Sequence, residues 1–300
     1  MKPMSPLMIA LLLTGSATAL AATPINESRA ADPAARIDIS NVRGAVTVSG
    51  WQHNRVEISG TLGKGSKGLR IDGSGSRIDI EVEKPESSGW FNWGSNSQME
   101  DSILEIRVPQ GAELHIETVS AEVTVTDLSG RLLDVDSVSG KIRLDSNTRE
   151  VEVGSISGTV ELTGNGERAH VETVSGDIDL RGNREHLKLE TVSGNISAST
   201  DTYREFSASS VSGDISLRGK PGTDARVDAE TMSGDIRMDA GADLSARIEA
   251  ETFSGRIRSD FGKVEEPEHG PGRSLDANVG AGNARIKIDT FSGDISIRRE

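Results

Sequence analysis

Acidic residues recur at one position of a repeated element in this sequence, and they are its most regular candidates for a binding site. The element is an apolar residue followed by Ser-Gly, with Ala in place of Gly in the first of nine copies. Four residues before this glycine position, seven copies carry a carboxylate: Glu117, Asp136, Glu172, Glu190, Glu230, Glu251 and Asp289. In stacked copies they would form an outward acidic ladder, in which like charges about 5 Å apart repel by roughly 1 kcal/mol per pair in water.

Nearby bases or bound cations must offset this repulsion. Candidate bases near the ladder in sequence are Lys188, Lys287, Arg143, Arg237 and Arg258. A solvated, partly compensated face is the simpler interpretation, because exposed charge pairs are usually weak. Calcium along the ladder is the alternative, although the Gly-Gly-x-Gly-x-Asp pattern of calcium-binding β-rolls is missing from the sequence.

Other residue types that could do chemistry do not converge. The five histidines form no His-Glu-x-x-His pair, and His115 and His170 share a column but lie three copies apart, about 14 Å at the spacing of stacked strands. The sequence holds no Cys and no Gly-x-Ser-x-Gly element. Gly63–Gly68 spells Gly-x-Gly-x-x-Gly, but no helix is expected after it to bind a phosphate, so a turn is predicted. We therefore expect no catalytic residue, no bound metal and no cofactor.

An aromatic cluster is the one local feature that suggests a ligand. Trp90, Phe91 and Trp93 lie within a Gly/Ser/Asn-rich stretch. Exposed Trp side chains can stack on sugars or lie at a membrane interface. Alternatively, the three rings fold back and cover the open end of a repeat structure, since such ends need capping.

The N-terminus predicts export. Lys2 precedes an apolar stretch at 7–13, and small residues follow with an Ala-x-Ala site at 17–19 or 19–21. This stretch is too short to span a bilayer, which takes roughly 20 apolar residues, and no second apolar run follows. A periplasmic, cell-surface or secreted bacterial protein without an integral membrane segment is expected after signal removal. The net charge of −14 disfavours nucleic acid as a partner.

The repeat that carries the acidic ladder predicts the fold. The glycine positions are 18–21 residues apart, with one interval of 38. Residues seven and five before and two and four after the glycine are apolar in nearly every copy, which indicates strands with one buried face. A hairpin at Ser-Gly would pair apolar with polar residues, so it is disfavoured. We predict an all-β, single-stranded β-solenoid of about nine coils of 18–21 residues, with irregular N-terminal strands.

This prediction also assigns the corner of each coil. The chain is expected to bend before the apolar residue of the element, so that this residue and the Gly face inward. Val174 and Val192 would then belong to the core. In domain terms we expect a signal peptide at 1–22, a flexible segment at 23–35 and one solenoid domain at 36–300, with loops at 84–102 and 260–284.

The sequence resembles the bacterial toastrack, or putative-adhesin, family of β-strand-repeat envelope proteins. The resemblance is carried by Thr-Val-Ser-Gly-Asp-Ile at 173–178, by its variants at 191–196, 210–215, 231–236 and 290–295, and by the stretch 107–120. It covers 36–300 and implies a solenoid-like fold, an envelope location and no catalytic residues. We expect a non-catalytic scaffold for adhesion or for binding an envelope protein or glycan. The alternatives are an accessory to envelope-stress sensing and, less favoured, a β-helical carbohydrate-active enzyme.

Overall fold

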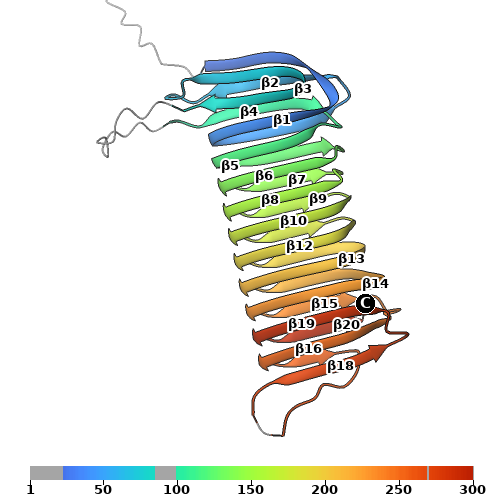
Figure 1. The fold of residues 1–300 in the computed structure, drawn as a ribbon. Helices are drawn as coiled ribbons and strands as arrows, with labels where there is room; N and C mark the ends of the chain where they lie inside the picture. Colours follow the sequence, from blue (N-terminus) through green and yellow to red (C-terminus); the bar gives the residue numbers. More distant parts are fainter. Residues whose placement is uncertain (1–22, 85–98, 269, 300) are drawn as a thin grey trace, which may run out of the picture.

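The protein is a long rod of stacked strands (Figure 1). The computed structural model describes residues 23–84, 99–268 and 270–299, which contain twenty β-strands and no helix. Consequently, no helix within these residues is long and apolar enough to cross a membrane. The predicted all-β solenoid is confirmed.

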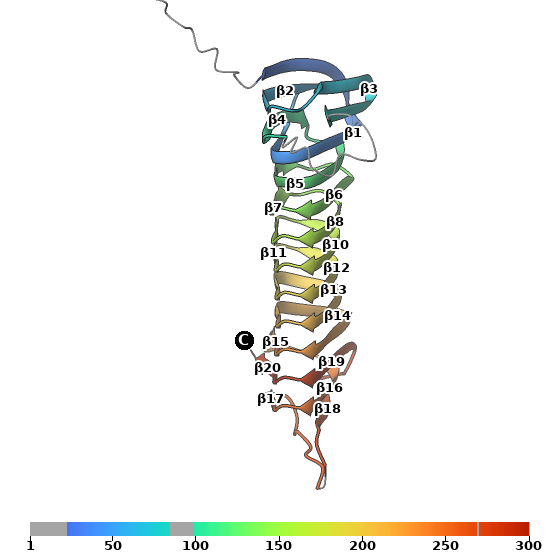
Figure 2. The same ribbon diagram turned by 90° about the vertical axis from the view of Figure 1, so that its left-hand side faces the viewer.

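Two rows of strands run along the central part of the rod, and each coil contributes one strand to each row (Figure 2). Corresponding strands of successive coils pair in parallel, as in Val171 with Leu189 and Ile178 with Ile196. The first row consists of β5 (Glu113–Leu128), β6 (Leu132–Ser139), β8 (Glu150–Ser157), β10 (Gly166–Ser175), β12 (Arg184–Ser193), β13 (Ile196–Ser212), β14 (Ile215–Ser233), β16 (Ala246–Ser254) and β19 (Ala284–Ser292). The second row consists of β7 (Ile142–Ser146), β9 (Val160–Thr163), β11 (Ile178–Arg181), β15 (Ile236–Ala240), β17 (Ile257–Ser259) and β20 (Ile295–Arg299), with parts of β5, β13 and β14.

The interior contains the predicted apolar columns. In the coil around Gly194, Leu187, Leu189, Ile196 and Ala198 are all buried. β-branched and leucine side chains stack on their equivalents in the coils above and below, since the parallel strands are in register. Hydrophobic burial along the whole rod therefore holds the coils together.

The corner of each coil differs from the prediction. The first-row strand continues straight through the apolar residue, and the chain bends only afterwards, at Gly and the residue that follows it. In β12, Thr191 is therefore buried and Val192 is 46% exposed. The phase of the alternation changes across the corner, so the inward assignment of Val174, Val192 and their equivalents was wrong.

The glycine at this corner is required by close approach of the stacked backbones. A Cβ added at Gly194 would lie 2.0 Å from the carbonyl oxygen of Gly176, and one at Gly213 would lie 1.8 Å from that of Gly194. The following residue ties the coils together, because the backbone N–H of Asn195 donates to Asp177 Oδ1 at 2.8 Å and that of Asp214 donates to Asn195 Oδ1 at 3.0 Å. Glycine and Asx residues thus allow the tight stacking of corners.

A buried guanidinium occupies the interior at the start of β12. Arg184 donates to the carbonyl oxygens of Thr148 and Arg168 at 3.1 Å and of Ser146 at 3.2 Å. Burial lowers the pKa of Arg184 to about 10. Backbone carbonyls, not carboxylates, therefore satisfy this charge.

The N-terminal end is closed by four strands: β1 (Thr23–Trp51), β2 (Arg55–Leu62), β3 (Gly68–Glu83) and β4 (Ser102–Pro109). The second half of β1 is parallel to β5 and adds a coil to the stack, while its first half is antiparallel to β2. Residues 23–35, expected to be flexible, lie in strand β1 instead, since β2 pairs with residues 23–30 and Ile25, Ala31 and Ala35 are buried.

The C-terminal coil does not lie last in the rod. β19 pairs with β14 on one side and with β16 on the other, and β20 lies in the same way between β15 and β17. Beyond β16, the strand β18 (Arg273–Val279) runs antiparallel and covers its free edge (Figure 1). The predicted loop at 260–284 is therefore partly strand, since Leu275 and Ala277 are buried against the last coil.

Candidate functional site

An unbroken line of exposed apolar side chains follows the first row of strands. Each is the residue before Ser-Gly, or before Ser-Ala in the first copy, and each is 42% to 62% exposed. Among the described residues, the exposed large hydrophobics are these nine and Ile103. We call the nine the apolar ladder: Val119, Val138, Ile156, Val174, Val192, Val211, Met232, Phe253 and Phe291.

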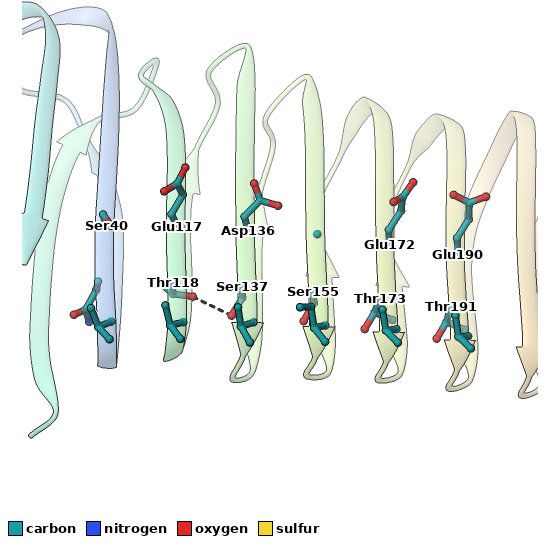
Figure 3. A pocket seen from close by; sticks show the side chains of 18 of the residues that line it. Ser40, Glu117, Thr118, Asp136, Ser137, Ser155, Glu172, Thr173, Glu190 and Thr191 are labelled. Atoms are coloured by element: carbon teal, nitrogen blue, oxygen red, sulfur yellow. Dashed lines mark hydrogen bonds between the residues drawn. The ribbon is translucent and has the colours of Figure 1, made fainter. Parts of the chain in front are cut away.

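The acidic ladder lies beside it on the same strands. Residues two apart on a strand point to the same face, so each carboxylate lies about 7 Å along the strand from the apolar side chain of its coil. Figure 3 shows Glu117, Asp136, Glu172 and Glu190 along one line, with the Ser/Thr column of Thr118, Ser137, Ser155, Thr173 and Thr191 along a second. The role of these acids in binding stays a prediction.

A groove runs between the two ladders, with the Ser/Thr column as its floor. Its first part has a volume of about 800 Å³ and extends from Ser40 to Val211. The second part, about 1080 Å³, shares Thr191, Ser209 and Val211 with the first and continues to Arg273 near the other end of the rod. One continuous groove thus spans most of the stack.

The groove is strongly acidic. Three basic side chains line it: Lys84, Arg273 and Lys287. Ten carboxylates line it: Glu117, Asp136, Glu172, Glu190, Glu230, Glu249, Glu251, Glu265, Glu266 and Asp289. Its formal charge is therefore −7 from these two sets.

Only part of this charge is paired within the protein. Lys188 Nζ lies 2.8 Å from Glu190 Oε2, and Lys287 Nζ lies 2.5 Å from Asp289 Oδ2. The hydrogen bond to Glu190 raises the pKa of Lys188, and that to Asp289 raises the pKa of Lys287. Arg273 Nε lies 2.7 Å from Glu266 Oε1, which also lines the groove. The arginines that the sequence offered as compensating bases, Arg143, Arg237 and Arg258, instead pair with acids that line neither part of the groove.

Two histidines contact carboxylates of the acidic ladder, His115 with Glu117 and His170 with Glu172. His115 lies 2.9 Å from Asp134 through Nδ1 and 2.9 Å from Glu117 through Nε2. Burial opposes its charge, but these two hydrogen bonds prevail and raise the pKa of His115. Burial, followed by the charge of Asp134, raises the pKa of Asp136.

These clusters also define where a cation could be held. Ligand atoms of His115, Asp134 and Asp136 lie within 4.8 Å of one another. Those of His170, Glu172 and Glu190 do so too. In the second cluster Lys188 Nζ lies 2.8 Å from Glu190 Oε2 and 3.7 Å from Glu172 Oε1, so an ammonium group already compensates the carboxylates there.

Two further features were singled out in the sequence. Trp90, Phe91 and Trp93 lie outside the described residues, so their role in binding or capping stays a prediction. Residues 63–67 connect strands β2 and β3 and contain the predicted turn, and Gly68 is the first residue of β3.

The apolar half of the groove was missed by the sequence reasoning, which placed those residues in the core. A usable signal was the Ser/Thr residue before each of them. Thr191 and its equivalents alternate in phase with the buried columns at seven and five before the Gly, which leaves the apolar residue on the outer face.

Comparison with known proteins supports this architecture. A crystal structure titled "putative lipid binding protein" from Parabacteroides distasonis shares 14% identity, with a TM-score of 0.55 over 92% of this chain and 96% of that chain. A "putative adhesin" from Bacteroides fragilis shares 13% identity, with a TM-score of 0.40 over 92% of this chain and 97% of that chain. At these identities the first structure indicates a shared fold, and the second carries no further argument.

The family assignment rests on the sequence as a whole. No curated protein matches the chain. The family model described as Toastrack DUF4097 matches residues 34–298, which include the whole first row of strands and both ladders. The chain therefore belongs to the Toastrack DUF4097 family.

Proposed function

We propose that this protein is a non-catalytic, exported scaffold of the bacterial envelope that binds an extended partner along its groove. The apolar ladder carries the proposal. Nine apolar side chains from coils far apart in sequence are aligned on one exposed line, and extended apolar patches of this kind mark binding surfaces. A rod of similar coils offers a partner an apolar contact in each coil.

Export is part of the proposal and rests on the sequence. Lys2, the apolar stretch at 7–13 and the Ala-x-Ala sites have the layout of a secretory signal. Fractionation of cells that express the full chain tests it. The protein should be recovered outside the cytoplasm, and a variant lacking 1–22 should stay inside; equal distribution of the two would refute export.

The binding role is tested with three neighbouring coils. The ladder variant Ile156→Ser/Val174→Ser/Val192→Ser changes exposed side chains and should leave the fold intact. The matched control Thr163→Ala/Arg181→Ser/Ser199→Ala changes exposed residues that pair with one another in the second row. The wild type and the control should sediment with isolated envelope fragments, and the ladder variant should remain in the supernatant.

Two results would contradict the proposal. Sedimentation of the ladder variant equal to that of wild type would show that the groove is not the binding surface. Turnover of isolated envelope glycans by the purified protein would replace a scaffold with an enzyme, which was the less favoured alternative from the sequence.

A further inference from the structure

The negative charge of the groove restricts which kinds of partner can bind in it. Resting on the function proposed above, we infer that the groove binds a cationic, amphipathic polypeptide segment that lies along the rod. Its apolar side chains contact the apolar ladder, and its Lys or Arg side chains contact the acidic ladder.

The apolar ladder sets the size of the contact. Nine side chains at the spacing of stacked strands, about 4.8 Å, extend over about 38 Å. This length takes about eleven residues of extended chain or about 25 residues of helix. The aromatic end is the most apolar part, because the rings of Phe253 and Phe291 stack 4.8 Å apart.

Unpaired carboxylates set the sign of the partner's charge. Glu230 and Glu251 line the groove beside Met232 and Phe253. No basic side chain of the described residues lies within 4.0 Å of either carboxylate, whereas Asp289 between them holds Lys287. A partner that brings ammonium or guanidinium groups to these two positions gains charge-assisted hydrogen bonds beside its apolar contacts.

The same charge disfavours other occupants of an apolar groove. A second copy of the chain that covered the apolar ladder with its own would bring two acidic ladders together. An anionic lipid surface or a nucleic acid would meet the same repulsion. Charge complementarity therefore favours a basic polypeptide over these alternatives.

Fluorescence anisotropy with designed peptides tests the inference. The probe is a labelled 20-residue peptide of Leu and Lys with the two residue types on separate faces. One comparison peptide has Glu in place of every Lys, and another has Ser in place of every Leu. The Leu/Lys peptide should bind in a salt-dependent manner, and each comparison peptide should bind at least tenfold more weakly.

Two pairs of variants connect the binding to the groove. Glu230→Gln/Glu251→Gln should weaken binding of the Leu/Lys peptide at least tenfold. Asp145→Asn/Asp224→Asn removes the same charge from exposed positions outside the groove and should change binding less than twofold. Equal losses of affinity for the Leu/Lys peptide in the two double variants would show that only the net charge of the protein matters. That result would overturn the inference.

The remaining outcomes separate this inference from the proposed function. The Leu/Glu peptide could bind as tightly as the Leu/Lys peptide and lose this binding in the ladder variant Ile156→Ser/Val174→Ser/Val192→Ser. That result would refute a cationic partner but keep the groove as the binding surface. Binding of the Leu/Lys peptide unchanged in that ladder variant would refute both. Sedimentation with phosphatidylglycerol vesicles, or a dimer by light scattering that the ladder variant abolishes, would replace the polypeptide by a lipid surface or a second copy.

Discussion

Two substitutions four residues apart test which side chains face the interior. Ile196 is 1% exposed and Val192 is 46% exposed, although both are β-branched residues of the same coil. Ile196→Asp should destabilise the rod severely, whereas Val192→Asp should be nearly neutral for folding.

The magnitudes follow from burial. Loss of a buried Ile side chain costs about 1.5–3 kcal/mol, and an interior carboxyl without hydrogen-bond partners costs about 1–3 kcal/mol more. The sum is a large part of the roughly 5–15 kcal/mol by which folded domains are stable. At Val192, the added charge lies about 7 Å from Glu190, where repulsion in water is about 0.6 kcal/mol.

Urea unfolding followed by circular dichroism near 215 nm measures both effects. We expect Ile196→Asp to lower the midpoint strongly or to prevent folding, and Val192→Asp to shift it only slightly. Equal destabilisation by the two substitutions would show that Val192 is a core residue, and the exposed apolar ladder would then not exist.

Three further substitutions address the corners, the interior and the ladder. Gly194→Ala should lower the free energy of unfolding by about 1–3 kcal/mol, because its Cβ would lie 2.0 Å from a backbone carbonyl oxygen; an unchanged urea midpoint would contradict the close stacking. Arg184→Lys should cost about 2 kcal/mol, since an ammonium group cannot reproduce the three hydrogen bonds of the guanidinium; a thermal melt equal to that of wild type would refute this. The pKa of His115 is raised, so its stabilising pairs with Asp134 and Glu117 are complete below its unfolded pKa and are lost as pH rises through its folded pKa. The stability difference between wild type and His115→Asn should therefore be larger at pH 5.5 than at pH 8.5, and a difference that is constant or grows with pH would contradict the assignment.

The repeat made most of the fold predictable. Apolar residues recur in register at positions such as Leu189 and Ile196, and the glycine positions are 18–21 residues apart with one exception, so stacking and inward columns follow from periodicity. The corner was not predictable in the same way. Alternation continues on both sides of Gly194 but changes phase across it, and the inward phase before the bend is continued by a Ser or Thr, not by an apolar residue.

The order of the last coils was also hidden in the sequence. The coil around Gly293 has the same column residues as the others, so the pattern fits it equally well at any place in the stack. Its insertion between β14 and β16 depends on the return of the chain through β18, whose antiparallel pairing closes the end. The strand conformation of residues 23–30 was hidden for a similar reason, because their partner β2 lies outside the repeat.

One side of the candidate site, the acidic ladder, was predictable from the sequence, and the other side, the apolar ladder, was misassigned. The acidic ladder was visible as a column because carboxylates are expected outside. The apolar ladder was interpreted as core because the residue before Ser-Gly alternates in phase with the apolar residues two and four after the Gly. In the structure the Ser/Thr column is buried, and Val174 and its equivalents are about half exposed.

Methyl-resolved NMR of the full chain, titrated with the Leu/Lys peptide, tests the central claim most directly. The methyl groups of Val174 and Val192 lie on the exposed ladder, and those of Ile178 and Ile196 lie in the interior of the same coils. We predict shifts that are confined to the ladder methyls and saturate with peptide. Saturable binding that leaves the methyls of Val174 and Val192 unperturbed would contradict the groove as the binding surface.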